Sequence, residues 1–138
     1  MFEQCIYFNT AALSRKLERI WTEAFRPFGL TPPQGFMLRA VLAQPGMLQS
    51  RLADELKIAR ATATRALDGL EAKGLIERRG SERDGRESEV HPTADAALLK
   101  DGLNAASGAV TARLKGQLGS TNFDDFVEQA KAINKLAR

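Results

Sequence analysis

The sequence predicts a mainly α-helical fold of six helices with one small β-hairpin. Apolar residues recur every three or four positions over most of the chain, which is the period of an amphipathic helix. Two of the expected helices are short and are separated only by residues 57–59. From residue 75 to 91 the helical period stops, and two extended stretches flank a polar turn that contains glycine. The hairpin should therefore follow directly on the pair of short helices.

Length and composition indicate one ordinary globular domain. The chain has 138 residues, of which 43% are hydrophobic and 27% are charged. It contains no apolar stretch of the roughly 20 residues that would span a bilayer, and its start lacks the features of a signal peptide. A single cysteine and a single histidine leave no internal disulfide and little for a zinc site. We expect a cytoplasmic, nucleoid-associated protein with no metal, no cofactor and no membrane contact.

Two helices are expected at the start of the chain. The first should run from about Asn9 to residues 27–29. The second should begin after Leu30, with Thr31 as its N-cap and Pro32 at its first position, and the Pro45-Gly46 pair should end it. Aromatic and aliphatic side chains give both helices an apolar side, among them Leu13, Leu17, Ile20, Trp21, Phe25, Phe36 and Leu38.

The two short helices are expected at Gln49–Leu56 and at Arg60–Lys73, and Gly74 is suited to terminate the second of them. Two short helices with a tight link form a helix-turn-helix. The second helix carries no acidic residue before Asp68. Its first turns combine small side chains, hydroxyls and arginines, which suit the edges of base pairs in a major groove. The candidate contact residues are Arg60, Ala61, Thr62, Thr64 and Arg65.

The alternative for this helix is an ordinary solvated surface with two incidental arginines. The hairpin that follows favours the nucleic-acid interpretation, because arginine is preferred in narrow minor grooves. Its strands are expected at 75–79 and 86–91, around a turn at 80–85. Its candidate contact residues are Arg78, Arg83, Asp84 and Arg86. The hairpin also contains four acidic residues, so the alternative is a soluble surface loop of mixed charge. We expect Asp84 to orient Arg65 or Arg86.

Two further helices are expected after the hairpin. Thr93 is a suitable N-cap for a long helix, with Asp95 in its first turn. This helix contains three glycines, which suggest close helix crossings or a bend. A last helix should open at Thr121, whose side chain can act as its cap. The expected apolar positions of the two helices are Leu99, Leu103, Ala106, Val110, Leu114, Leu118, Phe123, Phe126, Val127, Ala130, Ile133 and Leu136.

The stretch from Thr62 to Arg78, the segment Asp84-Gly85-Arg86 and the segment Val90-His91-Pro92-Thr93 closely resemble the MarR family of regulators. The resemblance implies a winged helix-turn-helix in which the hairpin is the wing. It also implies a homodimer that binds double-stranded DNA, with each recognition helix and wing at one half of a palindromic operator. Family members commonly repress genes and release DNA when a small, often aromatic, effector binds.

The resemblance also implies a division of labour within one compact domain. Residues 1–30 and 93–138 would supply the dimerisation helices, and residues 31–92 the DNA-binding region. Trp21, Phe25 and Phe36 are candidates for an effector pocket, although aromatic residues at helical spacing are more often core. The wing departs from the family pattern, since Gly85 takes the place of an arginine, so which arginine enters the minor groove is open.

Two other functions remain open at this point. Cys5 lies near the position where peroxide-sensing members of the family keep a reactive cysteine, which suggests a redox-responsive regulator. The second helix lacks the tyrosines of those sensors, and the alternative is a small apolar residue at the dimer interface. The acid-rich wing also allows a winged helix that binds another protein. An enzyme is not expected, because no nucleophile–base pair or metal set can be assembled.

Overall fold

The structure is a computed structural model that describes residues 1–80 and 87–136. Within these residues it has six α-helices and a small antiparallel sheet, which confirms the predicted fold class. In chain order the elements are α1 (Ile6–Phe25), the 3-10 turn η1 (Arg26–Phe28), α2 (Pro32–Ala43), β1 (Met47–Leu48), α3 (Gln49–Leu56), α4 (Arg60–Ala72), β2 (Ile76–Gly80), β3 (Ser88–Pro92), α5 (Ala94–Leu118) and α6 (Ser120–Asn134).

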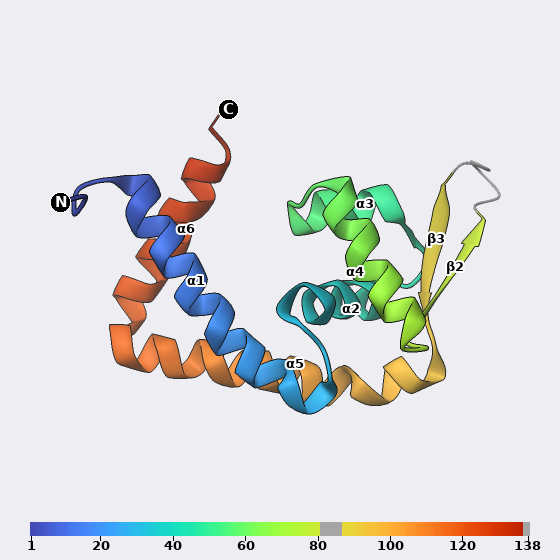
Figure 1. Ribbon diagram of the computed structural model, residues 1–138. Helices are drawn as coiled ribbons and strands as arrows, with labels where there is room; N and C mark the ends of the chain where they lie inside the picture. The colour runs from blue at the N-terminus through green and yellow to red at the C-terminus, as the bar shows by residue number, and fades with distance from the viewer. Residues whose placement is uncertain (81–86, 137–138) are drawn as a thin grey trace.

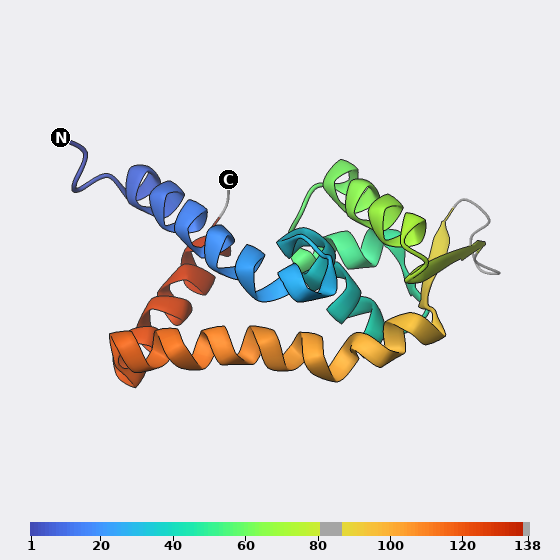
Figure 2. The ribbon, with the colours of Figure 1, turned by 60° about the horizontal axis from the view of Figure 1, so that its bottom comes forward.

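The elements form two lobes that share one long helix (Figure 1). The first lobe, here called the winged-helix lobe, consists of α2, α3, α4 and the three strands. The second, here called the terminal arm, consists of α1, α6 and the C-terminal half of α5. Helix α5 runs beneath both lobes, which is clearest in the rotated view (Figure 2). No described helix is long and apolar enough to cross a membrane.

Side-chain caps start two of the helices where the sequence predicts them. Thr31 and Gln34 form a capping box at α2, in which each side chain accepts a hydrogen bond from the other's backbone N–H. Thr93 accepts from the N–H of Ala96 at 3.3 Å and donates to the carbonyl of Gly74 at 2.8 Å. The start of α5 is thereby fastened to the end of α4.

Two helix starts differ from the prediction. Helix α1 begins at Ile6, three residues before Asn9, because the Sγ atom of Cys5 accepts a bond from the N–H of Phe8. Helix α6 begins at Ser120 rather than Thr121, and no side chain caps it. Its N-cap is Gly119, whose φ of 87° turns the chain sharply between α5 and α6.

The sheet contains one strand more than the predicted hairpin. Its order is β1-β3-β2, and all pairs are antiparallel. The additional strand β1 lies just before α3 and pairs Met47 with Val90. A strand of two residues has no detectable period, which is why the sequence does not reveal it. The base of the wing is therefore joined to the start of the helix-turn-helix.

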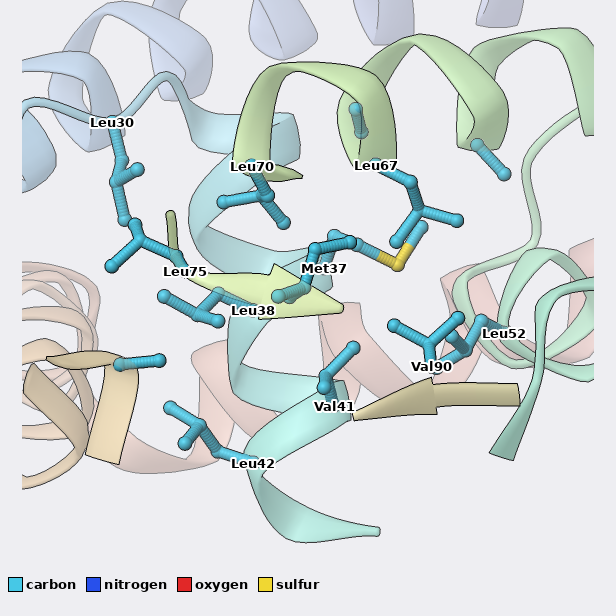
Figure 3. Packing of buried hydrophobic residues seen from close by; sticks show 14 of the residues in the cluster. Leu30, Met37, Leu38, Val41, Leu42, Leu52, Leu67, Leu70, Leu75 and Val90 are labelled. Carbon is cyan, nitrogen blue, oxygen red and sulfur yellow. The ribbon is translucent and has the colours of Figure 1, made fainter. Parts of the chain in front are cut away.

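The hydrophobic core lies mainly in the winged-helix lobe, where α2, α4 and the sheet meet (Figure 3). Leu38, Leu67, Leu70 and Val90 are fully buried there. Phe25, at the end of α1, belongs to the same core, and its ring packs directly against Gly35 of α2. Helix α6, in contrast, buries none of its own side chains.

Candidate nucleic-acid interface

The first two turns of α4 present an acid-free basic surface. The buried face of α4 is made of Ala63, Ala66, Leu67 and Leu70. Arg60, Ala61 and Arg65 are exposed on the other side, and Thr62 is half-buried. The Nη2 atom of Arg65 donates to Oγ1 of Thr62 at 3.2 Å. An exposed guanidinium group in this position has further donors available for an anionic partner.

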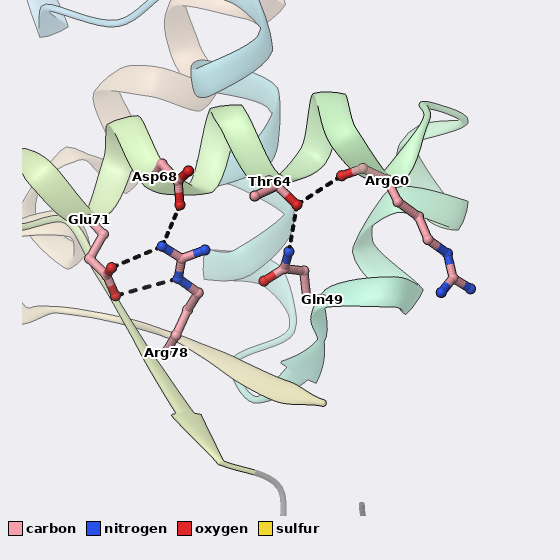
Figure 4. A network of polar contacts seen from close by, with 6 residues as sticks. All are labelled: Gln49, Arg60, Thr64, Asp68, Glu71 and Arg78. Carbon is pink, nitrogen blue, oxygen red and sulfur yellow. Dashed lines mark hydrogen bonds and ion pairs between the residues drawn. The ribbon is translucent and has the colours of Figure 1, made fainter. Parts of the chain in front are cut away.

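The hydroxyl of Thr64 connects the two helices of the helix-turn-helix (Figure 4). It accepts a hydrogen bond from Nε2 of Gln49 at 3.0 Å and donates one to the carbonyl of Arg60 at 3.0 Å. The hydroxyl proton is thus used within the protein, and one acceptor position is left. The structure gives Thr64 a role in holding α3 against α4, and its predicted contact with a base stays a prediction.

Arg78, a candidate contact residue of the wing, makes ion pairs within the protein. Its Nη2 atom lies 2.6 Å from Oδ1 of Asp68 and 2.9 Å from Oε1 of Glu71, both on α4 (Figure 4). Only 20% of the Arg78 side chain is exposed. The guanidinium group therefore fastens β2 to α4 and is occupied by two carboxylates. This is a structural role, and the predicted contact of Arg78 with DNA stays a prediction.

The same cluster shifts the pKa values of its members. The hydrogen bond from Arg78 lowers the pKa of Glu71 below its ordinary value. The pKa of Arg78 is raised, first by the hydrogen bond with Glu71 and then, against the opposing effect of burial, by that with Asp68. Both shifts favour the charged forms, so the ion pairs are maintained at neutral pH.

The tip of the wing was the other half of the predicted interface. Arg83, Asp84 and Arg86 lie outside the described residues, and so does the expected pairing of Asp84 with Arg65 or Arg86. Near the end of β2 that leads to the tip, Arg79 is 59% exposed, and its Nη2 atom lies 3.1 Å from Oε2 of Glu77.

A polar notch of about 270 Å³ lies between α3, α4 and the start of β3. Sequence reasoning did not identify it, because its residues come from three separate elements. The lining residues are Gln49, Ser50, Ala53, Arg60, Ala63, Thr64, Glu87 and Ser88. The notch adjoins the N-terminus of α3, which no side chain caps, so its first backbone N–H groups are available to an anion.

An apolar cavity of about 500 Å³ lies between α1, α2 and the link from α3 to α4. Trp21 and Phe36 line it, as the effector prediction requires, and their ring centroids are 6.3 Å apart. Phe25 does not line it, because its side chain is completely buried in the core. Thr62 is also part of the wall, which brings the cavity to the basic end of α4.

The terminal arm carries a large apolar groove of about 830 Å³ between α1, α5 and α6. Phe126 and Val127 line it and are 51% and 38% exposed. Further large apolar side chains are exposed on the same arm: Ile6, Tyr7, Phe8, Leu118, Ile133 and Leu136. Cys5 is also exposed here, and its proposed redox role stays a prediction.

Comparisons with known proteins point to one family. A family model described as the MarR family matches residues 28–87. YybA of Bacillus subtilis strain 168, named an uncharacterized helix-turn-helix-type transcriptional regulator, is 32% identical over 81 residues. That alignment covers 59% of this chain and 54% of YybA, so the chain spans about half the length of this relative. The transcriptional repressor MdtR of the same organism is 25% identical over 133 residues, covering 96% of this chain and 84% of MdtR.

The fold is also shared with solved structures. The transcriptional repressor CouR, whose structure is bound to a 23-mer DNA duplex, superposes with a TM-score of 0.82 and 25% sequence identity. The superposition covers 97% of this chain and 95% of the CouR chain. The similarity therefore includes both the winged-helix lobe and the terminal arm.

Proposed function

We propose that the chain is a transcriptional regulator of the MarR family and that it acts in the cytoplasm as a homodimeric repressor that binds a palindromic operator. The family-model match over residues 28–87 and the similarity to MdtR and CouR support this proposal. In this proposal α4 enters the major groove and the wing reaches the adjacent minor groove. The observation that carries the proposal is the acid-free surface of α4, where Arg60 and Arg65 are exposed. Forked guanidinium groups in this position pair with guanine edges or with phosphates.

The polar notch supports a contact with the DNA backbone beside the major groove. Ser50 and Arg60 line it together with the acidic Glu87. The N-terminus of α3, which no side chain caps, adds backbone N–H donors and a partial positive charge. Phosphate contacts of this kind fix the position of a protein on the duplex but carry no sequence information. Sequence preference would then come from the first turns of α4 and from the wing.

The terminal arm supports dimerisation through residues 1–30 and 93–138. An isolated monomer rarely exposes contiguous apolar patches larger than a few hundred Å². Here the apolar groove between α1, α5 and α6 and the exposed side chains around it need a cover. A second copy of the chain, related by a two-fold axis, covers such a surface with its own identical surface.

The cavity beside Trp21 and Phe36 is the proposed effector site. Its wall is predominantly apolar and aromatic, with a few polar groups, which is typical of small-molecule pockets. Since Thr62 of α4 is part of this wall, a bound molecule touches the recognition helix itself. A small aromatic effector would therefore be in a position to change the fit of α4 to DNA.

The test is DNA binding by Arg65→Ala, with Arg15→Ala as the control that removes an equal charge from the exposed surface of α1. Duplexes would first be selected from a random library by the wild-type protein. We expect Arg65→Ala to weaken binding to the selected duplex by about 10- to 100-fold at fixed salt, and Arg15→Ala to leave it nearly unchanged. Full-affinity binding by Arg65→Ala would refute the assignment of α4. Failure of the wild type to select any duplex would favour the protein-binding alternative.

A further inference from the structure

Ser107 of α5 is the one buried polar side chain among the described residues, with 5% of its surface exposed. Its hydroxyl accepts two hydrogen bonds from different helices. Nε1 of Trp21, on α1, donates at 3.1 Å, and Nη1 of Arg39, on α2, donates at 3.0 Å. One hydroxyl group therefore joins three helices that are distant in sequence.

Arg39 makes this junction unusual. Its side chain is half-buried, and no described carboxylate forms an ion pair with it. Its partners are neutral: Nε donates to Oδ1 of Asn104 at 2.7 Å, and the guanidinium carbon lies 5.2 Å from the centre of the Phe36 ring. Burial lowers the pKa of Arg39 from its ordinary value, which reflects an energetic penalty on the charge.

Apolar side chains of the same volume would fill such a junction without that penalty. What a polar junction adds is direction, because hydrogen bonds hold donors and acceptors at defined angles whereas apolar contacts can slide. The cluster of Trp21, Arg39, Asn104 and Ser107 is therefore better explained by the orientation it fixes than by the stability it provides.

The position of the cluster shows which orientation is fixed. Helix α1 belongs to the terminal arm, α2 belongs to the winged-helix lobe, and α5 passes beneath both (Figure 2). Ser107 lies near the middle of α5, where the two lobes meet. In a dimer assembled through the arms, the angle between arm and winged-helix lobe decides how far apart the two α4 helices stand.

We propose that Ser107 is a positioning residue that fixes the angle between the two lobes and thereby the half-site spacing that the dimer accepts. The inference rests on the proposed DNA-binding function. One added base pair moves a half-site by about 3.4 Å along the duplex axis and rotates it by about a tenth of a turn. A rigid dimer cannot follow this change, whereas a dimer with a loosened junction can.

The experiment compares the wild type with Ser107→Ala on two duplexes from the selection described above, one as selected and one with a single base pair added between the half-sites. Ser120→Ala, at the exposed start of α6, is the matched control. We expect the wild type and the control to lose about tenfold or more in affinity on the longer duplex, as for one badly mismatched contact. Ser107→Ala should bind the longer duplex less than about threefold more weakly than the selected one, a difference no larger than one weak hydrogen bond contributes.

Trp21→Phe provides a second variant, because it removes the Nε1 donor and keeps a smaller aromatic ring in its place. It should relax the spacing preference in the same direction as Ser107→Ala, which also loses the bond from Arg39. The double variant should relax it no further than Ser107→Ala alone, since the bond from Trp21 is already lost there. Trp21 is the single tryptophan of the chain, so its fluorescence emission should shift in Ser107→Ala and stay unchanged in Ser120→Ala.

Wild-type spacing preference in Ser107→Ala and Trp21→Phe would overturn the proposal, and so would an unchanged emission spectrum in Ser107→Ala. If Ser107→Ala does not fold, Trp21→Phe decides by the same criterion. Absence of binding by the wild type would instead refute the proposed DNA-binding function, so the two failures are distinguishable.

Discussion

Replacing Arg78 with alanine tests whether the wing is fastened to α4 through one guanidinium group. The variant loses the contacts to Asp68 at 2.6 Å and to Glu71 at 2.9 Å. Arg79→Ala is a matched control on the next residue of β2, because Arg79 is 59% exposed and contacts only the neighbouring Glu77 among the described ion pairs. Both variants remove one positive charge from the same strand.

The expected magnitude follows from the exposure of the groups. Hydrogen bonds between charged partners contribute up to about 1.5–3 kcal/mol when shielded from water, whereas exposed ion pairs contribute about 0–1 kcal/mol. The Arg78 side chain is only 20% exposed, but its two partners are 59% and 45% exposed. An intermediate loss of about 1–2 kcal/mol is therefore expected for Arg78→Ala, and less than about 0.5 kcal/mol for Arg79→Ala.

Arg78→Ala should also weaken DNA binding more than the control does. It leaves two carboxylates without their cation on the helix that is proposed to enter the major groove, and these repel phosphate. The free energy of unfolding would be measured by urea denaturation, and DNA affinity at two salt concentrations. Equal losses of stability and of affinity in the two variants would refute the role of Arg78, because they would show that only the total charge matters.

Two further predictions concern stability. Gly35→Ala should lower the free energy of unfolding by about 1–3 kcal/mol, because its Cβ would overlap the buried ring of Phe25. Gly108→Ala, in open space on α5, should raise it by up to about 1 kcal/mol. Urea unfolding that ranked the two variants in reverse would contradict this packing. The lowered pKa of Glu71 means that its pairing with Arg78 stabilises the fold above the ordinary glutamate pKa of about 4.3 and that this contribution disappears as the pH falls through the lowered value. Glu71→Gln should remove this part of the acid dependence, and unfolding curves between pH 3 and 7 that parallel the wild type would argue against it.

The sequence predicts the helices well where local chemistry decides the outcome. Thr31 and Thr93 cap their helices as expected, because a side chain and the backbone three residues later are always close at a helix start. The start of α6 and the strand β1 were not predicted correctly. Both depend on tertiary structure: α6 begins after the sharp turn at Gly119, and β1 exists only because β3 lies beside it.

For the candidate site residues, the sequence indicates which face of an element they occupy but not which residues they contact. The aromatic residues of α1 and α2 look equivalent in the sequence, yet Trp21 and Phe36 line the cavity whereas Phe25 is buried. Likewise, periodicity places Thr64 on a polar face, but only the packing of α3 brings Gln49 within hydrogen-bond distance of it. Spacing determines which face a residue occupies, and the opposing element determines what that residue contacts.

The contacts made by the opposing element also determine how charge is distributed over the proposed interface. Between Arg51 and Val90 basic and acidic residues are equal in number, and such a balance gives DNA no net attraction. The structure pairs Asp68 and Glu71 with Arg78, however, and both acids lie toward the C-terminal end of α4. No described ion pair involves Arg60 or Arg65. The guanidinium group of Arg78 thus offsets part of the negative charge of α4 at its C-terminal end, and the exposed arginines lie at the end that is proposed to contact the bases.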